Sequence, residues 1–329
     1  SIKLSALHPR YEEAQKARVK AELVPRVTAL ARQARAAQMG LNIDAEEADR
    51  LELSLDVIEA VLRDETLAGW DGFGVVVQAY GKRAGGVIDW LHALAQDLDR
   101  KLMVRLVKGA YWDGEIKRAQ VDGVPDFPVF TSKAATDVSF ICCADKLLGY
   151  SDRIYPQFAT HNAHTVAAIL QIAGDNRAYE FQRLHGMGEA LHDLVVGQER
   201  RACRIYAPVG AHRDLLAYLV RRLLENGANS SFVNQLVDED VSATEIAADP
   251  FAALGAPRPD LLRDPAELFA PERGNSAGWD LQTPGDAAHF EAVRAPFAES
   301  HWEVGPEDGE AVTIRNPARP DDAVGTARL

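Results

Sequence analysis

Short runs of apolar residues alternate along the chain with longer segments in which apolar residues recur at helical spacing. Most of the runs are continuous rather than alternating, and several are rich in Val, Ile and Phe. Continuous apolar runs are typical of parallel strands that are buried on both faces. The sequence therefore predicts seven parallel strands, at Ile2–Leu7, Leu41–Asp44, Gly74–Tyr80, Leu102–Gly109, Ile154–His161, Tyr179–His185 and Cys203–Gly210.

The segments between these runs have the pattern of amphipathic helices. We expect helices at 45–67, 85–97, 132–148, 164–172 and 213–226. The last of them is followed by Gly227, a residue that commonly ends helices. Alternating strands and helices predict right-handed βαβ units and hence an α/β fold with a parallel sheet.

The strand count alone is compatible with an open doubly wound sheet and with a closed (βα)8 barrel. No G-x-G-x-x-G motif follows a predicted strand, which disfavours a dinucleotide-binding sheet. Polar residues gather directly after the predicted strands, as they do on the catalytic face of a TIM barrel. We therefore expect a (βα)8 TIM-like barrel that lacks its first strand in this chain.

The character of the chain changes after about Asn234. Residues 238–329 are rich in Asp, Pro and Ala, and prolines at 257, 259, 265, 271 and 284 interrupt any long helix. We interpret this stretch as a linker followed by part of a neighbouring module. The chain begins with Ser1 rather than Met and has no apolar leader segment, so we expect missing upstream residues and no signal peptide.

Net charge and cysteine usage narrow the classes of protein. The formal net charge of −13 disfavours nucleic-acid binding through this region, because phosphates require dense Lys and Arg. The three cysteines, Cys142, Cys143 and Cys203, have neither disulfide nor zinc spacing. They predict buried free thiols and a cytoplasmic protein. No apolar stretch reaches the length of about 18 residues that a membrane span needs.

The last predicted helix carries a polar stripe of Tyr218, Arg221, Arg222 and Glu225, spaced three and four residues apart. Two adjacent arginines offer paired N–H donors that suit a carboxylate ligand. The alternative is a solvated face with an internal Arg–Glu pair. We expect the buried surface of this helix to come largely from its leucines, at positions 215, 216, 219 and 223.

A second polar cluster lies where the fourth predicted strand meets its loop. Arg105 and Lys108 interrupt the apolar run, and a buried charge is costly unless it is paired or meets a ligand. Gly109 and Ala110 leave room for a flat ligand, and Tyr111 and Trp112 follow them. A structural salt bridge with packed aromatic rings is the alternative interpretation.

Other strand ends also carry polar groups. Thr160, His161 and Asn162 end one run, and each can hydrogen-bond a ligand. His161 and His164 also suggest a metal, but no complementary carboxylate or H-x-H spacing accompanies them, so no metal site is predicted. Further candidates at the same end of the strands are Lys3, Asp44, Gln78, Gln182, Leu184 and Tyr206.

Six blocks of this sequence resemble the proline dehydrogenase domain of bifunctional proline-utilisation proteins. The blocks, which occur in the family's order, are residues 1–12, 106–113, 158–162, 179–189, 204–210 and 218–229. The resemblance implies a distorted (βα)8 barrel that holds FAD. It also implies oxidation of L-proline to pyrroline-5-carboxylate, with electrons passed to a membrane quinone. A metal-dependent barrel hydrolase or aldolase is the alternative function.

The resemblance also implies roles for individual residues. By motif position, Lys3, Arg221 and Arg222 bind the proline carboxylate, and with Tyr206 they form the implied catalytic group. The substrate pocket further comprises Asp44, Tyr111, Leu184, Tyr218 and Glu225. The FAD-binding residues are Gln78, Arg105, Val107, Lys108, Gly109, Ala110, Tyr111, Trp112, Thr131, Lys133, Thr160, His161, Asn162, Gln182 and Phe232. No residue stands out as a base, and bulk water can take the substrate proton.

The end of the chain carries a second resemblance. Residues 314–320 and 324–326 are similar to the opening of an aldehyde dehydrogenase domain, which in such proteins oxidises glutamate semialdehyde with NAD. The resulting division is a barrel at 1–236, a linker at 237–285 and an aldehyde dehydrogenase fragment at 286–329. The expected partners are L-proline, a membrane quinone and the rest of that second domain. We expect a homo-oligomeric, cytoplasmic full-length protein that associates peripherally with the inner membrane.

Overall fold

The computed structural model describes residues 1–227, 242–255 and 262–329. They fall into two units, Ser1–Trp279 and Asp280–Leu329. The first unit contains the predicted barrel region.

The first unit is built on one six-stranded parallel sheet whose strands follow their order in the chain. The strands are β1 (Leu41–Ile43), β2 (Phe73–Gln78), β3 (Leu102–Val107), β4 (Ile154–Ala159), β5 (Glu180–Leu184) and β6 (Ala202–Tyr206). Each lies within or at the edge of a predicted run, so six of the seven predicted strands are confirmed.

The first predicted strand, Ile2–Leu7, is wrong as a strand. Ile2 makes one isolated parallel bridge to Ile43 of β1, and the chain then turns. The turn is closed by backbone hydrogen bonds from Ala6 to Lys3 and from Leu7 to Leu4, while Leu4 is buried in the core. Leu4 is therefore buried by a turn instead of a ladder, with Ile2 and Leu7 partly buried beside it.

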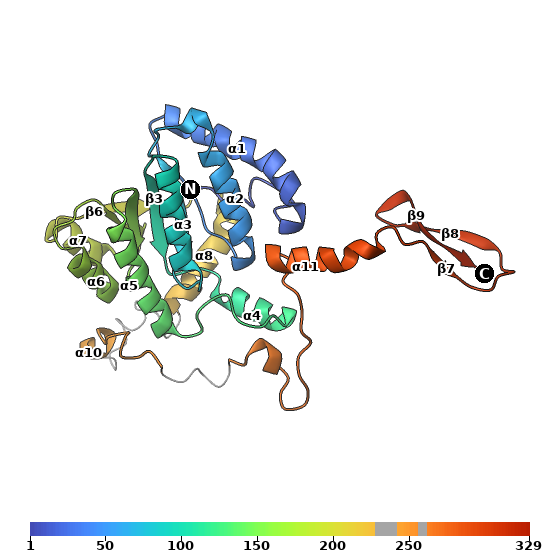
Figure 1. Cartoon of the computed structure of the whole chain (residues 1–329). Helices are drawn as coiled ribbons and strands as arrows, with labels where there is room; N and C mark the ends of the chain where they lie inside the picture. The colour runs from blue at the N-terminus through green and yellow to red at the C-terminus, as the bar shows by residue number, and fades with distance from the viewer. Residues whose placement is uncertain (228–241, 256–261) are drawn as a thin grey trace. The chain divides into compact units, whose positions relative to one another are not determined.

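Apart from the short α10 (Ala243–Ile246), eight α-helices of this unit accompany the sheet in the described residues (Figure 1). They are α1 (Lys16–Ala36), α2 (Leu51–Leu62), α3 (Ala84–Asp97), α4 (Trp112–Asp122), α5 (Lys133–Gly149), α6 (Ala163–Ala173), α7 (Glu189–Gly197) and α8 (His212–Gly227). The predicted helices at α3, α5, α6 and α8 are confirmed. The helix predicted at 45–67 is shorter, and α1, α4 and α7 were not predicted.

The sheet is strongly curled, as in a TIM-like barrel. Asn42 of β1 donates to Gln157 of β4 at 3.1 Å, although two strands lie between them. Neighbouring strands are spaced about 4.8 Å apart, so strands three positions apart in a flat sheet would be separated by about 14 Å. Their side chains can meet inside only if the sheet curves, which confirms the predicted barrel-like class.

The main core lies between the strands and the outer helices. Its largest fully buried side chains include Phe73, Phe140, Phe158 and Phe181. Each buried phenylalanine contributes about 2–3 kcal/mol of hydrophobic stabilisation. This core holds the strand ends in place and thereby positions the polar side chains that follow them.

Two predictions about buried side chains are wrong. Leu216, Leu219 and Leu223 of α8 are 55%, 44% and 72% exposed, because no described residue covers that side of the helix. Cys142 is also exposed, since it lies on the outward side of α5, although all three cysteines are free as predicted.

The second unit contains α11 (Pro284–Arg294) and a three-stranded sheet of β7 (Trp302–Val304), β8 (Ala311–Asn316) and β9 (Arg319–Arg328). β9 is central, parallel to β7 and antiparallel to β8. Among the described side chains and backbones of this unit, Gly325 alone is buried.

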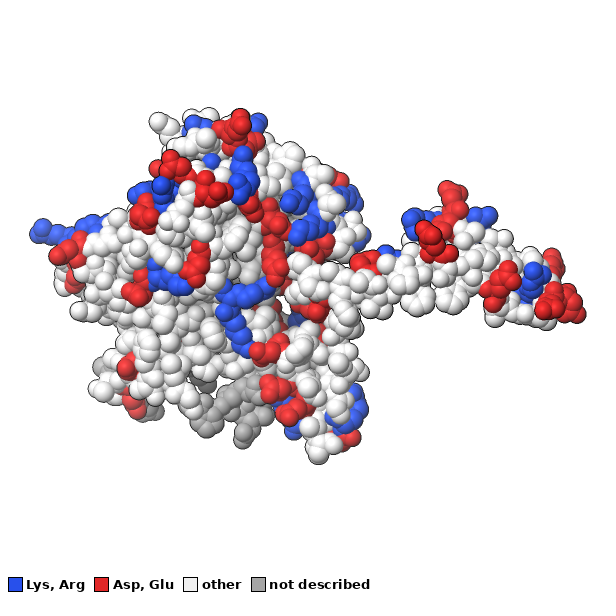
Figure 2. Space-filling view, in the orientation of Figure 1, with Lys and Arg blue, Asp and Glu red and all other residues white. Residues whose placement is uncertain are grey.

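No helix in the described residues is both long enough and apolar enough to cross a bilayer. On the face shown in Figure 2, Lys and Arg side chains are interspersed with Asp and Glu and form no continuous basic patch. The acidic balance of the whole sequence is therefore spread over a mixed surface on that face.

Candidate active site

The first group of site residues joins the N-terminal turn to the loop after β3. Lys3 donates from Nζ to the hydroxyl of Tyr111 at 3.0 Å and to the carbonyl of Ala45 at 3.4 Å. Lys3 and Tyr111 are 108 residues apart in sequence, and curvature of the sheet brings their segments together. The pair places an ammonium group and a phenol side by side.

Arg105 connects three further segments. It donates to the Asp44 carboxylate at 3.2 Å and to the Ser1 hydroxyl at 3.0 Å. Its guanidinium also lies 5.6 Å from the centre of the Tyr206 ring, although β3 and β6 are three strands apart. The buried Nε of Arg105 has no hydrogen-bond partner within the described ranges, so it retains one unused donor.

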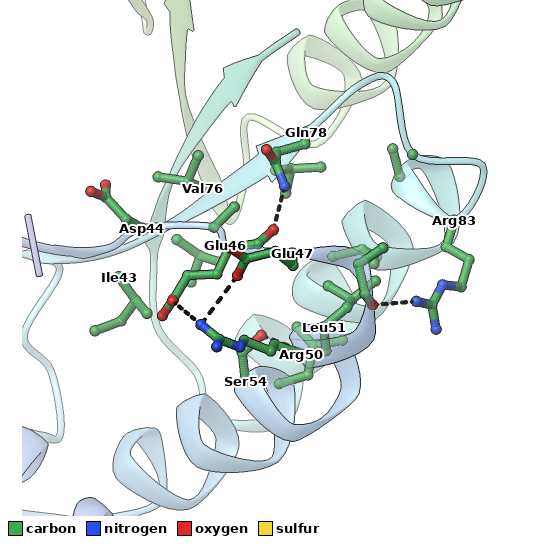
Figure 3. Close-up of a pocket in the computed structure, with 18 of the residues that line it drawn as sticks. Ile43, Asp44, Glu46, Glu47, Arg50, Leu51, Ser54, Val76, Gln78 and Arg83 are labelled. Carbon is green, nitrogen blue, oxygen red and sulfur yellow. Dashed lines mark hydrogen bonds and ion pairs between the residues drawn. The ribbon is translucent and has the colours of Figure 1, made fainter. Parts of the chain in front are cut away.

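Gln78, at the end of β2, joins the loops after β1 and β3. Its amide donates to the carbonyl of Glu46 at 2.8 Å, and its carbonyl accepts from the Ala110 backbone N–H at 3.3 Å. Gln78 and the loop after β1 line a cavity together with residues of α2 (Figure 3), and its volume is about 60 Å³. The Asp44 carboxylate points away from the Glu46–Arg50–Glu47 ion pairs in that view.

The loop after β3 is held by local contacts. Val107 accepts a backbone hydrogen bond from Ala79 at 2.8 Å. Gly109 has φ +142°, and a Cβ there would come 2.5 Å from the Tyr80 ring, so only glycine fits. Trp112 is partly exposed and donates to the Phe130 carbonyl at 2.8 Å.

Two predicted cofactor lysines share one carboxylate. Lys108 and Lys133 both form ion pairs with Asp137 of α5, the latter at 2.8 Å. Burial alone would raise the pKa of Asp137, but the two ammonium groups hold it below its usual value. Thr131 lies one residue before Ser132, which caps α5 by accepting from the Ala135 N–H at 3.0 Å.

The segment after β4 presents a neutral histidine. His161 accepts at Nε2 from the Leu184 backbone N–H at 3.1 Å, and burial followed by nearby positive groups lowers its pKa to about 4. Thr160 Oγ1 accepts from the Asn162 N–H at 3.2 Å, and Asn162 caps α6 through Thr165. These three predicted residues therefore share one turn, with the imidazole uncharged at neutral pH.

Gln182 lies deeper, in a polar layer inside the sheet. Its amide donates to Glu180 at 2.7 Å, and Glu180 also receives two hydrogen bonds from Arg204, at 2.7 and 2.8 Å. The buried carbonyl oxygen of Gln182 has no partner in the part of the chain that is described. It therefore has an unused acceptor that points to a further ligand or water.

On α8, the Arg222 guanidinium lies 5.4 Å from the centre of the Tyr218 ring. Its charge is one of the causes that lower the pKa of His161, after burial and His192, which places it near the β4 turn. The side chains of Arg221 and Glu225, and all of Phe232, lie outside the described residues. The predicted pairing of two arginines on α8 stays a prediction.

Some residues of this site were not predicted. Asp137 lies four residues after Lys133 on a helix, a spacing that favours an ion pair. His192 of α7 is fully buried, hydrogen-bonds the Thr160 carbonyl at 3.0 Å and contacts His161 edge-on. No sequence pattern marks His192, because it sits alone on an otherwise ordinary amphipathic helix.

Cationic and phenolic side chains thus converge at the carboxyl ends of β1 to β6, beside an uncharged imidazole. Such a set can bind an anionic group and orient a ring, while unused polar atoms remain for a larger ligand. No group of three or more His, Cys, Asp or Glu side chains in the described residues is placed to hold a metal.

Comparison with known proteins assigns the chain and its fold to a family. The family model for proline dehydrogenase matches residues 1–235. The chain belongs to the proline dehydrogenase family. A dehydrogenase of this family implies a redox cofactor, and the predicted resemblance is confirmed.

The relatives are long proteins. The "Bifunctional protein PutA" of Klebsiella aerogenes is 52% identical over 100% of this chain and 27% of its own length. The protein of that name from Rhizobium meliloti is 53% identical over 99% of this chain and 28% of its length. The chain spans about a quarter of the length of these relatives.

Solved structures of proline dehydrogenase family members support the same assignment. A crystal structure of proline utilization A from Bradyrhizobium japonicum has a TM-score of 0.87 and 54% identity, covering 92% of this chain and 31% of that one. Proline utilization A from Bdellovibrio bacteriovorus, "inactivated by N-propargylglycine", has a TM-score of 0.87 at 29% identity, covering 100% and 35%.

Proposed function

We propose that this chain carries an FAD-dependent activity that oxidises L-proline to pyrroline-5-carboxylate, the first step from proline toward glutamate. The observation that carries the proposal is the convergence of Lys3, Asp44, Arg105, Tyr111 and Tyr206 at one end of the sheet. Family membership and the relatives named as bifunctional PutA support it.

The cationic residues suit the proline carboxylate. Lys3, Arg221 and Arg222 would bind the carboxylate. Holding the carboxylate in place would orient the proline ring for reaction. Tyr111 and Tyr206 lie against Lys3 and Arg105 respectively, so they would bound the pocket. The remaining lining residues would be Asp44, Leu184, Tyr218 and Glu225.

The residues present fit a large polar cofactor. Arg105 Nε and Gln182 Oε1 are buried without partners among the described residues, and FAD offers both acceptors and donors. The residues that would hold it lie in or after β2 to β5, apart from Phe232, which is outside the described residues: Gln78, Arg105, Val107, Lys108, Gly109, Ala110, Tyr111, Trp112, Thr131, Lys133, Thr160, His161, Asn162, Gln182 and Phe232. When bound, FAD supplies the capacity to accept a hydride from the carbon beside the ring nitrogen.

The chain's own residues provide orientation and charge. Arg105, which pairs with Asp44 in a partly buried site, would stabilise negative charge that accumulates in a bound ring system. His161 is neutral because burial, followed by nearby positive groups, lowers its pKa, so it adds a dipole rather than a charge. The substrate amine must lose a proton, and bulk water would take it.

The proposal extends to the whole protein. We infer a quinone in the membrane as the electron acceptor, reached by a cytoplasmic protein that associates peripherally with the inner membrane. Residues 286–329 would begin an aldehyde dehydrogenase domain that uses NAD, after a barrel at 1–236 and a linker at 237–285. The full-length protein would form a homo-oligomer.

The decisive experiment is an anaerobic absorption spectrum of the purified full-length protein before and after addition of L-proline. A yellow flavin spectrum that bleaches with L-proline, and not with D-proline, is the expected result. A colourless protein, or a flavin that stays oxidised, would refute the proposal.

Arg222 tests the carboxylate contact. Replacing it with alanine should weaken proline binding by about 2–5 kcal/mol, the range for removing one side of a buried charge pair. Arg213→Ala on the same helix is the matched control, because that side chain is 90% exposed. Equal proline affinities for the two variants, measured by anaerobic flavin titration, would contradict this assignment.

A further inference from the structure

Helix α4 is anchored differently from the other helices of the first unit. Its inward residues Ile116 and Ala119 pack in a small cluster with Tyr80, Phe127 and Val129, separate from the main core. Leu262 packs against the same cluster. We call residues 262–279 the connector, because they lie at the end of the first unit, directly before the second.

The connector also satisfies the polar end of α4. The last carbonyls of a helix have no partner inside it. Asn275 donates to the Gln120 carbonyl at 2.8 Å, and the Gly278 N–H donates to the Gly123 carbonyl at 3.2 Å. In return, the Gln120 side chain donates to the Arg263 carbonyl at 2.9 Å.

Two glycines permit this close approach. Gly123 ends α4 with φ +63°, a conformation that favours glycine, and a Cβ there would overlap the Ser276 carbonyl. A Cβ on Gly278 would overlap the Asp122 carbonyl. The backbones of α4 and the connector are thus in direct contact at a place where neither tolerates a side chain.

The opposite end of α4 begins at the site. Tyr111 is the N-cap residue, its carbonyl accepts from the Glu115 N–H at 3.0 Å, and its hydroxyl accepts from Lys3. Glu115 is 4% exposed and accepts from the Ala48 N–H at 2.6 Å. An 11-residue helix is about 16 Å long and moves as a rod, so a shift at Gly123 reaches Tyr111.

We propose that the connector positions Tyr111 through α4, with Asn275 and Gly278 as positioning residues for proline oxidation. The inference rests on the proposed function, in which Tyr111 bounds the substrate pocket. Displacements of about 1 Å far from the chemistry can reduce rates about 100-fold, so a partial loss of this support is measurable.

The first test compares Asn275→Ala with wild type in the full-length protein, with an artificial electron acceptor. The expected result is a fall in kcat/KM of about 10-fold, chiefly through KM for L-proline. Asn176→Ala is the matched control, a loop asparagine of the same unit whose side chain accepts from Ala178 at 2.8 Å. It should leave both constants within about twofold.

A double-mutant cycle with Tyr111→Phe separates positioning from general destabilisation. If the connector acts through the Tyr111 hydroxyl, Asn275→Ala should change KM by less than about twofold in the Tyr111→Phe background. Multiplicative losses would overturn the inference. Gln120→Ala removes one connector contact and retains the asparagine, so it provides a milder variant that should shift KM in the same direction.

Amide hydrogen exchange measures the coupling between the connector and Tyr111 without requiring proline oxidation. Amides of residues 111–116 should exchange faster in Asn275→Ala and Gly278→Ala than in wild type or Asn176→Ala. Unchanged exchange in that segment overturns the inference even if proline is oxidised. If wild type does not oxidise proline, the proposed function fails, while the exchange data still decide whether the connector holds α4.

Discussion

The imidazole of His161 shows how one residue's surroundings decide its charge. Burial, then the positive groups of His192, Arg222 and Arg183, lower its pKa from 6.5 to about 4. The unfolded chain therefore binds this proton more readily than the folded protein between pH 6.5 and 4. The stability that the neutral His161 contributes is fully present above pH 6.5, and it is lost as the pH falls from 6.5 to about 4.

We expect the free energy of unfolding to depend on pH because of the His161 side chain. The shift corresponds to at most about 3 kcal/mol, and urea unfolding at pH 7 and pH 5 should show part of it as lower stability at pH 5. His161→Gln keeps an acceptor without the titration and should reduce that difference. His212→Asn, an exposed substitution on α8, should leave it unchanged. An identical pH dependence in His161→Gln and wild type would contradict the assignment.

Asp137 provides the complementary case of a depressed carboxyl pKa. Burial opposes its ionisation, yet Lys108 and Lys133 stabilise the charged form. Asp137→Asn leaves two ammonium groups facing a neutral amide and should lower the free energy of unfolding by about 1–3 kcal/mol at pH 7. The loss should shrink as the pH falls through the depressed pKa of Asp137, because the wild-type carboxyl then becomes neutral as well. A pH-independent difference in chemical denaturation would argue against the ion pair.

At the scale of elements, the strands were the most predictable part of the fold. The run Phe73–Gln78 is nearly continuous because most of its residues on both faces of the strand are buried. In Leu102–Val107 buried and partly buried residues alternate, and Arg105 is one of the partly buried residues. Ile2–Leu7 has the same composition but lies where the chain turns, and composition alone does not distinguish a buried turn from a strand. Helix α4 was missed because its few apolar residues face a small cluster formed partly by the distant connector.

The candidate site, like the fold, was only partly predictable from the sequence. Arg105 and Lys108 stood out because charge interrupts an apolar run, and both lie in the site with carboxylate partners. Asp44 comes from the segment after β1, so its pairing with Arg105 depends on sheet curvature that no local pattern encodes. Asp137 pairs with Lys108 because α5 packs near the end of β3. His192 gave no signal, because its role depends on a backbone carbonyl on another element.

Helix α1 contains an exposed proline, Pro25, in its interior. Proline there removes one backbone hydrogen bond and crowds the preceding turn, at a cost of about 3 kcal/mol in a helix interior. Pro25→Ala should raise the free energy of unfolding by about 1–3 kcal/mol, since no buried contact is lost. Gln33→Ala, also exposed in α1, controls for the introduced alanine. A stability no higher than that of Gln33→Ala would show that the helix has already accommodated the proline.

At the scale of the whole molecule, the two units differ in what supports them. The first has a continuous core of strands and helices, whereas the described residues of the second are mostly exposed or partly buried, with only Gly325 buried. A sheet gains stability from an apolar face packed against another layer. The folding free energy of the chain therefore resides mainly in the first unit.

Two truncations of the 329-residue chain test this division. Ending the chain after Trp279 should leave the thermal unfolding midpoint within about 2 °C, because few buried groups are removed. Ending it after Ser242 also removes the connector, which carries the Leu262 packing and the hydrogen bonds of Asn275 and Gly278 to α4. That loss of about 2–3 kcal/mol should lower the midpoint by several degrees. If both truncations lowered the midpoint equally, the support would come from residues 280–329, and the connector would contribute nothing to the stability of the barrel.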